Sequence, residues 1–408
     1  MSAVKRLVTL AMLVAVVVSL EMYGLSTLAA DRQAIIAWLS GDGLYTYGMS
    51  LPPAAAILLV PAAAMPLAMA GGALAVAGVA TLLLALTALA GPVARRYGRA
   101  RQPVVLATGA LALTLEPVRS TLGLGHLDLI LFGLVVADLV ALRRSAWART
   151  RATWWPSTAR DGRLRHVWRT GAWAGAGIGV ASALCPGTLL FVAYLALTRQ
   201  WRAVLTALGT TTGLVIGALL AAPGASAAWF GTVLPGIDRD GPFDTPANQS
   251  LAGVLARLYD SASTPVMVWL SFAVLLLAVG LIRARAAHAE GDEIAAFTLV
   301  GLAGAAVAPV STANELLWVL PAILILIDAG ARRRANPRRP TPRRLTGLGP
   351  FAAAATVTLV FALPPIGNIP AITAIVLLNA LPWRPAAPLR RRPAVVARVP
   401  AIPGPRGS

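Results

Sequence analysis

Residues 72–91 read GALAVAGVATLLLALTALAG and are followed at once by the basic pair Arg95-Arg96. Twenty apolar residues in a helix, at about 1.5 Å each, cross the roughly 30 Å hydrocarbon layer of a bilayer. Similar runs recur along all 408 residues, of which 57% are hydrophobic and only 12% are charged, with a mean hydropathy of +0.73. Soluble domains carry about 25% charged residues. The sequence therefore predicts an all-α integral membrane protein.

Thirteen apolar segments divide the chain, and short arginine clusters separate many of them. They lie at about 7–28, 51–70, 72–91, 103–117, 121–142, 171–184, 185–199, 203–221, 266–282, 294–309, 314–330, 348–366 and 369–384. Arginine clusters concentrate in cytoplasmic loops of membrane proteins. Assigning every cluster to the cytoplasm gives a consistent alternation from residue 72 onward, with both termini cytoplasmic. This arrangement requires an even number of crossings.

Segment 51–70 is the best candidate for one that does not cross, because prolines interrupt it: Pro52, Pro53, Pro61 and Pro66. Such a segment can enter and leave the membrane on one side where neighbouring protein satisfies its backbone. The alternative keeps it as a span and merges 171–184 with 185–199, but it puts the basic joints at Arg95 and Arg143 outside. We expect about twelve spans plus a re-entrant or interfacial segment. Together they form one polytopic domain, residues 1–384, before a disordered, basic cytoplasmic tail, residues 385–408.

Charge and cysteine content exclude two classes of function. A net charge of +19 is compatible with nucleic-acid binding. However, the arginines lie in short clusters between apolar runs. We therefore expect membrane lipids, and not nucleic acid, as partners. Cys185 is the single cysteine, and the chain has three histidines, two of them in cytoplasmic joints. We therefore expect no metal site and no cofactor.

The same alternation assigns most acidic residues to the outer face. Asp31 directly follows the first span and suits either a general base at a membrane mouth or an interfacial helix cap. His126 and Asp128 begin a span, where ionisable residues usually face a cavity. Asn314 and Glu315 open another span, and a lipid-facing Glu315 would be costly there.

The long outer loop, residues 222–265, contains Asn248, Gln249 and Arg257. The two amides suit either polar substrate binding or simple loop structure. An outer arginine departs from the positive-inside trend, so Arg257 is a candidate for holding a phosphate, although it could equally pair with Asp260.

These residues, in this order, resemble the polyprenol-phosphate-mannose-dependent α-(1→2)-mannosyltransferases of actinobacteria. This family belongs to the membrane-embedded GT-C glycosyltransferases and resembles glycosyltransferase family 87. The resemblance covers about residues 20–330, and Asn248-Gln249-Ser250-Leu251-Ala252-Gly253 with Arg257, like the family's N-Q-S-L-x-G-x-x-x-R, is its most specific part. The other matching positions are Asp31, Gly41 to Tyr45, Pro52-Pro53, Gly125 to Asp128, Leu184-Cys185-Pro186, Arg199 to Arg202, and Pro309 to Pro321.

Several family positions differ in this chain. The family lysine before L-x-P is Ala183, its paired histidines are Asn314 and Glu315, and His126 and Asp128 replace a glutamine and an asparagine. Arg257 and His126 are then the cations expected to bind a donor phosphate.

The resemblance implies a GT-C-type helical bundle that moves mannose from a polyprenyl-phosphate donor lipid to a glycolipid or lipoglycan acceptor. Transfer would be inverting, with Asp31 as general base and substrate-binding roles for Tyr45, His126, Asp128, Asn248, Gln249, Arg257, Asn314 and Glu315. The expected location is the plasma membrane, with the active site facing outward. One alternative is a transferase for another sugar, such as arabinofuranose. Another is a non-catalytic relative that acts as a partner or carrier of lipid-linked intermediates.

Overall fold

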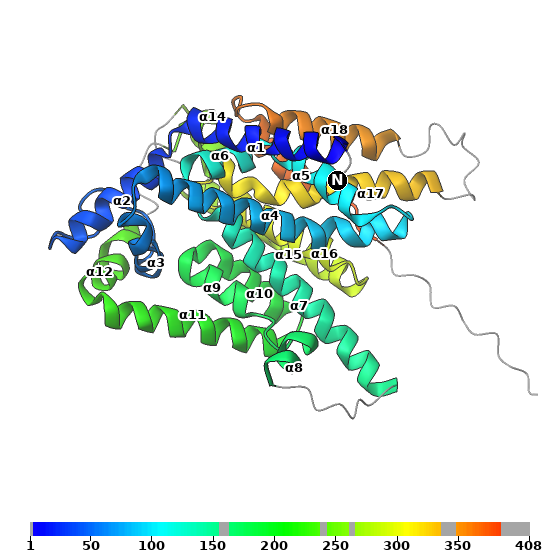
Figure 1. Cartoon of the computed structure of the whole chain (residues 1–408), viewed down its shortest axis with the longest axis horizontal. Coiled ribbons are helices and arrows are strands. Elements are labelled where there is room, and N and C mark those ends of the chain that lie inside the picture. The colour runs from blue at the N-terminus through cyan, green and yellow to red at the C-terminus, as the bar shows by residue number, and fades with distance from the viewer. Residues whose placement is uncertain (1–2, 155–162, 237–242, 261–265, 336–347, 385–408) are drawn as a thin grey trace, which may run out of the picture.

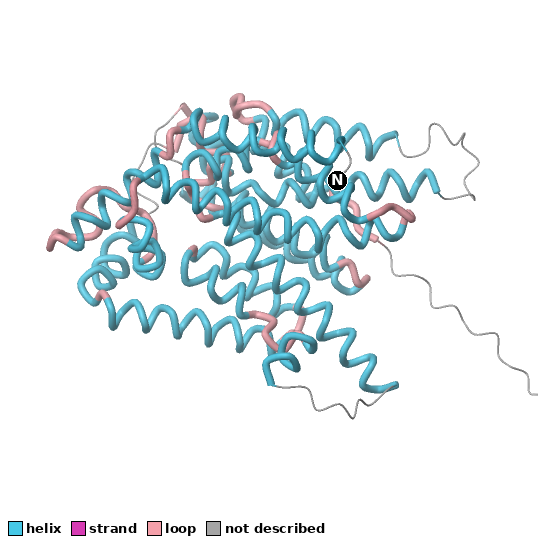
Figure 2. Tube along the Cα trace, viewed as in Figure 1, coloured by secondary structure: helices cyan, strands magenta, loops and turns pink. Residues whose placement is uncertain are grey.

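The computed structural model describes residues 3–154, 163–236, 243–260, 266–335 and 348–384, and the predicted tail at 385–408 lies outside these ranges. The described residues form helices joined by loops, with no strand among them (Figure 2). Most of the long helices run along the longest axis of the molecule (Figure 1). The predicted all-α class is confirmed.

Within the described ranges, five helices are long and apolar enough to cross a membrane. They are contained in α1 (Ala3–Tyr23), α4 (Leu67–Arg96), α11 (Trp201–Ala221), α15 (Val266–Ala289), and the 3₁₀ segment η3 (Ala313–Trp318) with α17 (Val319–Ala335). A sixth span results if α6 (Glu116–Leu124) and α7 (Asp128–Trp154), which meet at a bend of 120°, are counted as one. The expected number of about twelve crossings is therefore not confirmed for the described residues.

The remaining helices are shorter. They are α2 (Ser26–Leu39), α3 (Pro53–Ala63), α5 (Arg101–Ala112), α8 (Arg163–Thr170), α9 (Ala176–Leu184), η1 (Pro186–Thr188), α10 (Leu189–Leu197), α12 (Pro223–Ala228), the π-helix η2 (Trp229–Val233), α13 (Leu234–Gly236), α14 (Leu251–Leu258), α16 (Glu293–Val307), α18 (Leu348–Ala362) and α19 (Ile369–Ala380). Many predicted apolar segments thus form helices shorter than the 17–25 residues that a full crossing requires.

Segment 51–70 contains the 11-residue helix α3 and the start of α4. Eleven helical residues extend only about 16 Å, which is too short to cross the hydrocarbon layer. Pro52 and Pro53 lie at the beginning of α3, where a missing backbone N–H is tolerated, and Pro66 precedes α4. The short helix is consistent with a segment that does not cross.

The first apolar segment, 7–28, breaks after Tyr23 into α1 and α2. Gly24 and Leu25 both adopt positive φ angles, and the Leu25 N–H donates to the Gly123 carbonyl, 2.9 Å away. A Cβ at Gly123 would lie 2.4 Å from the Ser19 carbonyl oxygen, so glycine permits α6 to pack directly on α1. This contact brings α2 beside the bend between α6 and α7.

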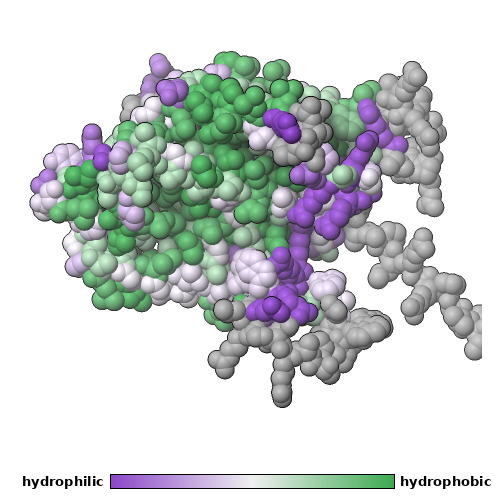
Figure 3. All heavy atoms as spheres, in the orientation of Figure 1, coloured by the Kyte–Doolittle hydropathy of each residue, from purple (hydrophilic) through white to green (hydrophobic). Residues whose placement is uncertain are grey.

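Polar residues are concentrated at one end of the bundle. Apolar side chains cover most of the visible surface, and hydrophilic residues gather at the end where α7, α8 and α17 terminate (Figure 3). The last turn of α4 carries Arg95 and Arg96, and the last turn of α17 carries Arg332, Arg333 and Arg334. We call this the arginine-rich end.

Buried polar contacts fix the central helices. Asp138 of α7 is fully buried, and its carboxylate accepts a hydrogen bond from the Ile178 N–H, 2.6 Å away, in the first turn of α9. A carboxylate there satisfies backbone donors that the helix itself leaves free. This contact fixes α9 against α7 and so determines where the following Cys185-Pro186 turn lies.

Candidate active site

Asp31 lies on α2, one turn after Leu28, and α2 approaches the α6–α7 bend closely. The bend is made by Gly125, whose φ of 79° is left-handed and ends α6. A Cβ at Gly125 would lie 2.7 Å from the Leu28 Cβ, so only glycine allows this approach. As a result Asp31 and His126 interact electrostatically across the two segments.

His126, Asp128 and Asn314 lie together as one polar group. The Asn314 side-chain amide donates to Asp128 Oδ2 at 2.6 Å, and the His126 Nδ1 lies 3.7 Å from the same oxygen. The Thr312 hydroxyl donates to the Asn314 side-chain oxygen, which fixes the orientation of the amide. Asn314 is buried, whereas His126 and Asp128 keep 28% and 20% of their side chains exposed. The exposed fractions leave both groups accessible to a ligand.

Glu315 adds another carboxylate beside Asp128, and the two negative charges repel one another. The side chain of Glu315 is exposed, although its neighbours Asn314, Leu316 and Leu317 are buried. Cys185, at the end of α9, experiences the charges of both carboxylates. We refer to Asp31, His126, Asp128, Asn314 and Glu315 as the carboxylate cluster.

The side-chain amides of Asn248 and Gln249 form hydrogen bonds within the protein. Asn248 donates to the Phe243 and Pro309 carbonyls and accepts from the Ser250 and Ser311 backbone N–H groups. Gln249 donates to the Pro246 and Gly367 carbonyls and accepts from the Ala371 N–H. Both residues are buried and make protein hydrogen bonds with donor and acceptor alike. In this structure the Asn248 amide fixes the segment that leads into η3, whereas the Gln249 amide fixes the turn between α18 and α19.

Arg257, on α14, connects the long loop to the α18–α19 turn. Its Nε donates to the Asn368 side-chain oxygen and one Nη donates to the Thr245 carbonyl, both at 2.6 Å. The second Nη is buried without a hydrogen-bond partner among the described residues. Burial lowers the pKa of Arg257, and Asp244 partly opposes that effect. Asn368 is not among the residues predicted from the sequence. Its position as a single asparagine between two apolar segments is a signal that could have identified it.

Tyr45 lies in the turn between α2 and α3. Its hydroxyl donates to the Leu51 carbonyl at 3.1 Å, and its ring lies 5.8 Å from the Trp229 ring. The hydrogen bond closes the 41–51 turn, and within the described residues Tyr45 makes no hydrogen bond or ring contact with the carboxylate cluster. Tyr45 therefore stands apart from the other predicted site residues.

Two arginines near the cluster were also overlooked. Arg119 donates to a Glu116 oxygen at 2.7 Å, and the Tyr23 hydroxyl donates to the other oxygen. Arg32, next to Asp31, donates from Nε to the Ala63 and Met65 carbonyls at the end of α3, each at 3.0 Å. A side chain at a helix C-terminus satisfies carbonyls that the helix leaves free. Both arginines lie in joints that the sequence assigns to the outer face. This position is the feature that could have identified them as candidate site residues.

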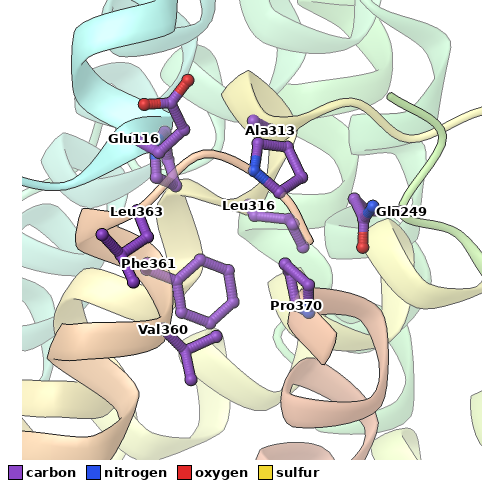
Figure 4. A pocket seen from close by; sticks show the side chains of 10 residues that line it. Glu116, Gln249, Ala313, Leu316, Val360, Phe361, Leu363 and Pro370 are labelled. Atoms are coloured by element: carbon purple, nitrogen blue, oxygen red, sulfur yellow. The ribbon is translucent and has the colours of Figure 1, made fainter. Parts of the chain in front are cut away.

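A small pocket of about 10 Å³ lies where α6, η3, α18 and α19 meet. Glu116 lies above the ring of Phe361 and Gln249 lies across from it (Figure 4). This volume holds about one water molecule. The pocket therefore does not serve as a sugar-binding cavity in this conformation.

The cluster suits acid–base chemistry. Burial raises the pKa of Asp31 above the ordinary aspartate range, and the nearby His126 partly offsets this rise. A carboxylate of raised pKa is a stronger base near neutral pH. A neighbouring imidazolium can bind an anionic leaving group. Among the described residues, no group of three or more His, Cys, Asp or Glu side chains is arranged to hold a metal ion.

Comparison with known proteins identifies the class. The sequence profile of glycosyltransferase family 87 matches residues 45–312. A polyprenol-phosphate-mannose-dependent alpha-(1-2)-phosphatidylinositol mannoside mannosyltransferase of Mycobacterium tuberculosis is 30% identical over 322 residues, covering 73% of this chain and 69% of that protein. The protein of the same name from Mycolicibacterium smegmatis is 27% identical over 328 residues, with the same coverage. No solved structure matches the chain significantly.

These matches cover most of the chain, and they make it a membrane-bound glycosyltransferase. More particularly, the chain belongs to glycosyltransferase family 87. The profile includes His126, Asp128 and the 248–257 segment, whereas Asp31 and Asn314-Glu315 lie outside its limits. The predicted family resemblance is confirmed.

Proposed function

We propose that this protein transfers a mannosyl residue from a polyprenyl-phosphate donor to a glycolipid or lipoglycan acceptor at the outer membrane face. The donor class is supported by the relatives, which are named as polyprenol-phosphate-mannose-dependent mannosyltransferases acting on phosphatidylinositol mannosides. The observation that carries the proposal is the carboxylate cluster. In it, groups far apart in sequence meet beside a broken helix.

Asp31 is the general base in this proposal. It accepts the proton of the acceptor hydroxyl while that oxygen attacks the anomeric carbon from the face opposite the phosphate. The bond from the anomeric carbon to the phosphate oxygen breaks, and the phosphate leaves with the electron pair. A single displacement converts a β-linked donor into an α-linked product. The half-buried position of Asp31 and its raised pKa support this role.

Cations near the leaving phosphate stabilise its developing charge. His126, held beside Asp128, and Arg257, with one buried Nη without a partner among the described residues, are the proposed groups. Arg119 is a further candidate, because its Nε is also buried without a hydrogen-bond partner in the described part of the chain. Asp128 and Asn314 orient His126 and the acceptor. Asn248 acts through the segment before η3 that it holds, and Gln249 acts through the α18–α19 turn.

Orientation in the membrane rests on charge. The arginine-rich end is assigned to the cytoplasm by the positive-inside rule. Asn314 precedes Asp328 by 14 residues along η3 and α17, which corresponds to about 21 Å of helix. The carboxylate cluster is therefore assigned to the outer side.

The test is transfer of radiolabelled mannose from polyprenol-phosphate-mannose in membranes that contain the overexpressed chain. Asp31→Asn is expected to abolish incorporation while the protein level in membranes stays unchanged. A matched control is Asp42→Asn, because Asp42 is exposed and accepts only a 3.3 Å hydrogen bond from Tyr47 among the described residues. Unchanged transfer by Asp31→Asn would remove Asp31 from the mechanism.

A parallel reaction with a polyprenyl-phosphate pentose tests the donor. Incorporation from the pentose donor alone would replace mannose with a sugar such as arabinofuranose. No incorporation from either donor by the unmodified chain would favour a partner or carrier role over catalysis.

A further inference from the structure

A cavity of about 390 Å³ opens at the arginine-rich end, between α4, α7, α16 and α17. Its charged lining consists of four arginines and three acidic residues, which leaves one positive charge in excess. Cavities of about 300–1,000 Å³ are the usual size for small-molecule sites. Arg143, on α7, lies 15 residues beyond Asp128, which corresponds to about 22 Å along the helix. The cavity is therefore separate from the carboxylate cluster.

Three of the four arginines neutralise one carboxylate. Asp328 accepts hydrogen bonds from Arg384 Nε at 3.0 Å and from Arg96 Nη1 at 3.4 Å. It also forms ion pairs with Arg384 Nη2 at 2.7 Å and with Arg332 Nε at 3.0 Å. These ion pairs connect α4, α17 and the residues after α19. The ion pairs with Asp328 therefore give Arg96, Arg332 and Arg384 a structural role.

Arg143 has no comparable partner. It lines the cavity, and among the described residues no carboxylate oxygen lies within 4 Å of it. Its charge interacts with those of Asp292 and Glu293, and both of these acids are engaged elsewhere. Asp292 accepts from the Ala295 and Arg384 backbone N–H groups. Glu293 accepts from the Tyr194 hydroxyl and lies 2.7 Å from His288 Nδ1.

We propose that this cavity binds a phosphate group, with Arg143 as its principal contact. A guanidinium inside a cavity is costly unless an anion compensates its charge. Arginine presents several N–H donors in a planar fork that matches phosphate oxygens. Asp292, Glu293 and Asp328 are already used within the protein, and Glu290, which also lines the cavity, forms no ion pair with Arg143. Either the headgroup of an anionic membrane lipid or free phosphate has the required chemistry.

The experiment uses the full chain purified in detergent and in nanodiscs. Lipids that remain bound are measured by native mass spectrometry after exposure to equal amounts of phosphatidylglycerol and phosphatidylcholine. Inorganic phosphate is tested separately by its effect on the melting temperature, because a ligand bound only by the folded state raises it. Preferential retention of phosphatidylglycerol identifies a lipid headgroup. A phosphate-dependent rise without such retention identifies free phosphate.

Arg143→Gln is expected to weaken the observed binding roughly tenfold or more, since it removes a charge-assisted contact to phosphate. Arg144→Gln is the matched control, because Arg144 packs over the Trp168 ring and does not line the cavity. Val93→Phe, which fills the cavity without changing its charge, is a second variant should Arg143→Gln fail to fold. Equal binding by Arg143→Gln and Arg144→Gln would overturn the proposal, as would the absence of both effects in the unmodified protein.

Discussion

Asp128 and Asp328 lie toward opposite ends of the same helical bundle, and their surroundings differ in kind. Asp128 has an amide, a histidine and a second carboxylate beside it. Asp328 has three arginines and the Tyr97 hydroxyl. An ion-pair network of the second kind holds segments together, whereas clustered carboxylates with few counter-charges are typical of sites that use their charge in a reaction. The comparison separates a structural acid from a candidate catalytic one.

Asp328→Ala tests the structural end and has the largest expected effect. It leaves three arginines without their shared carboxylate. Removing one partner from a fully buried ion pair costs about 3–5 kcal/mol, and the cost here is smaller because the three arginines are partly exposed. We expect a clear drop in melting temperature in detergent, with specific transfer activity retained by the protein that remains folded. Glu21→Ala, at an exposed acid on α1, is the control. Equal melting temperatures for the two variants would mean that the network does not hold the fold.

Asp128→Ala tests the reactive end. The change removes the acceptor of Asn314 and the carboxylate beside His126, but no arginine loses a partner. We expect transfer to fall about 100-fold, within the range for groups that assist proton transfer, with little change in melting temperature. Asp42→Ala should retain full transfer. A variant that loses stability but keeps its activity per folded molecule would contradict this assignment.

The pH dependence of transfer sharpens the contrast further. Burial raises the pKa of Asp31, and the proposed base works only when it is deprotonated. Activity should therefore be present above this raised pKa and be lost as the pH falls through it. The loss should come at a higher pH than an ordinary aspartate would produce. An initial-rate profile that stays flat down to the usual aspartate range would exclude Asp31 as the titrating base.

Gly125→Ala has the smallest expected effect, because it changes no charge. The variant places a Cβ in a left-handed residue, at a cost of about 1–2 kcal/mol, and also pushes against Leu28. Gly98→Ala is a matched control at the arginine-rich end, with a φ of 63° and nothing within 4 Å of the added Cβ. Only Gly125→Ala should reduce transfer beyond its loss of stability. Equal transfer by both variants would show that the distance between α2 and the bend is unimportant.

The sequence predicts the class of fold and much of the candidate site. Apolar periodicity and arginine position are local properties, so they predict a helical membrane protein with Asp31, His126, Asp128 and Glu315 on one side. The structure brings these residues into one cluster. The family resemblance is also carried by local motifs, and its most specific one, the 248–257 segment, lies within the range that the family profile matches.

Other features depend on contacts that no local pattern encodes. Asp328 pairs with Arg96 across 232 residues, and Arg257 finds Asn368 across 111. Asp138 looks like an anomaly inside the apolar segment 121–142 until α9 is packed against it. Helix length also cannot be predicted from an apolar run alone. The run 103–117, for example, does not indicate that its helix ends at Ala112. The number of crossings therefore does not follow from the apolar runs alone.

The bend at Gly125 interrupts a ladder of backbone hydrogen bonds where α6 gives way to α7. Part of the wall of the candidate site is therefore main chain, which a side-chain substitution does not remove. Such a wall allows neighbouring side chains to vary while the shape of the site persists. This explains how His126 and Asp128 can stand where the resembling family has glutamine and asparagine. The break thus makes this part of the site tolerant of sequence change, because its shape is set by backbone that a side-chain substitution leaves in place.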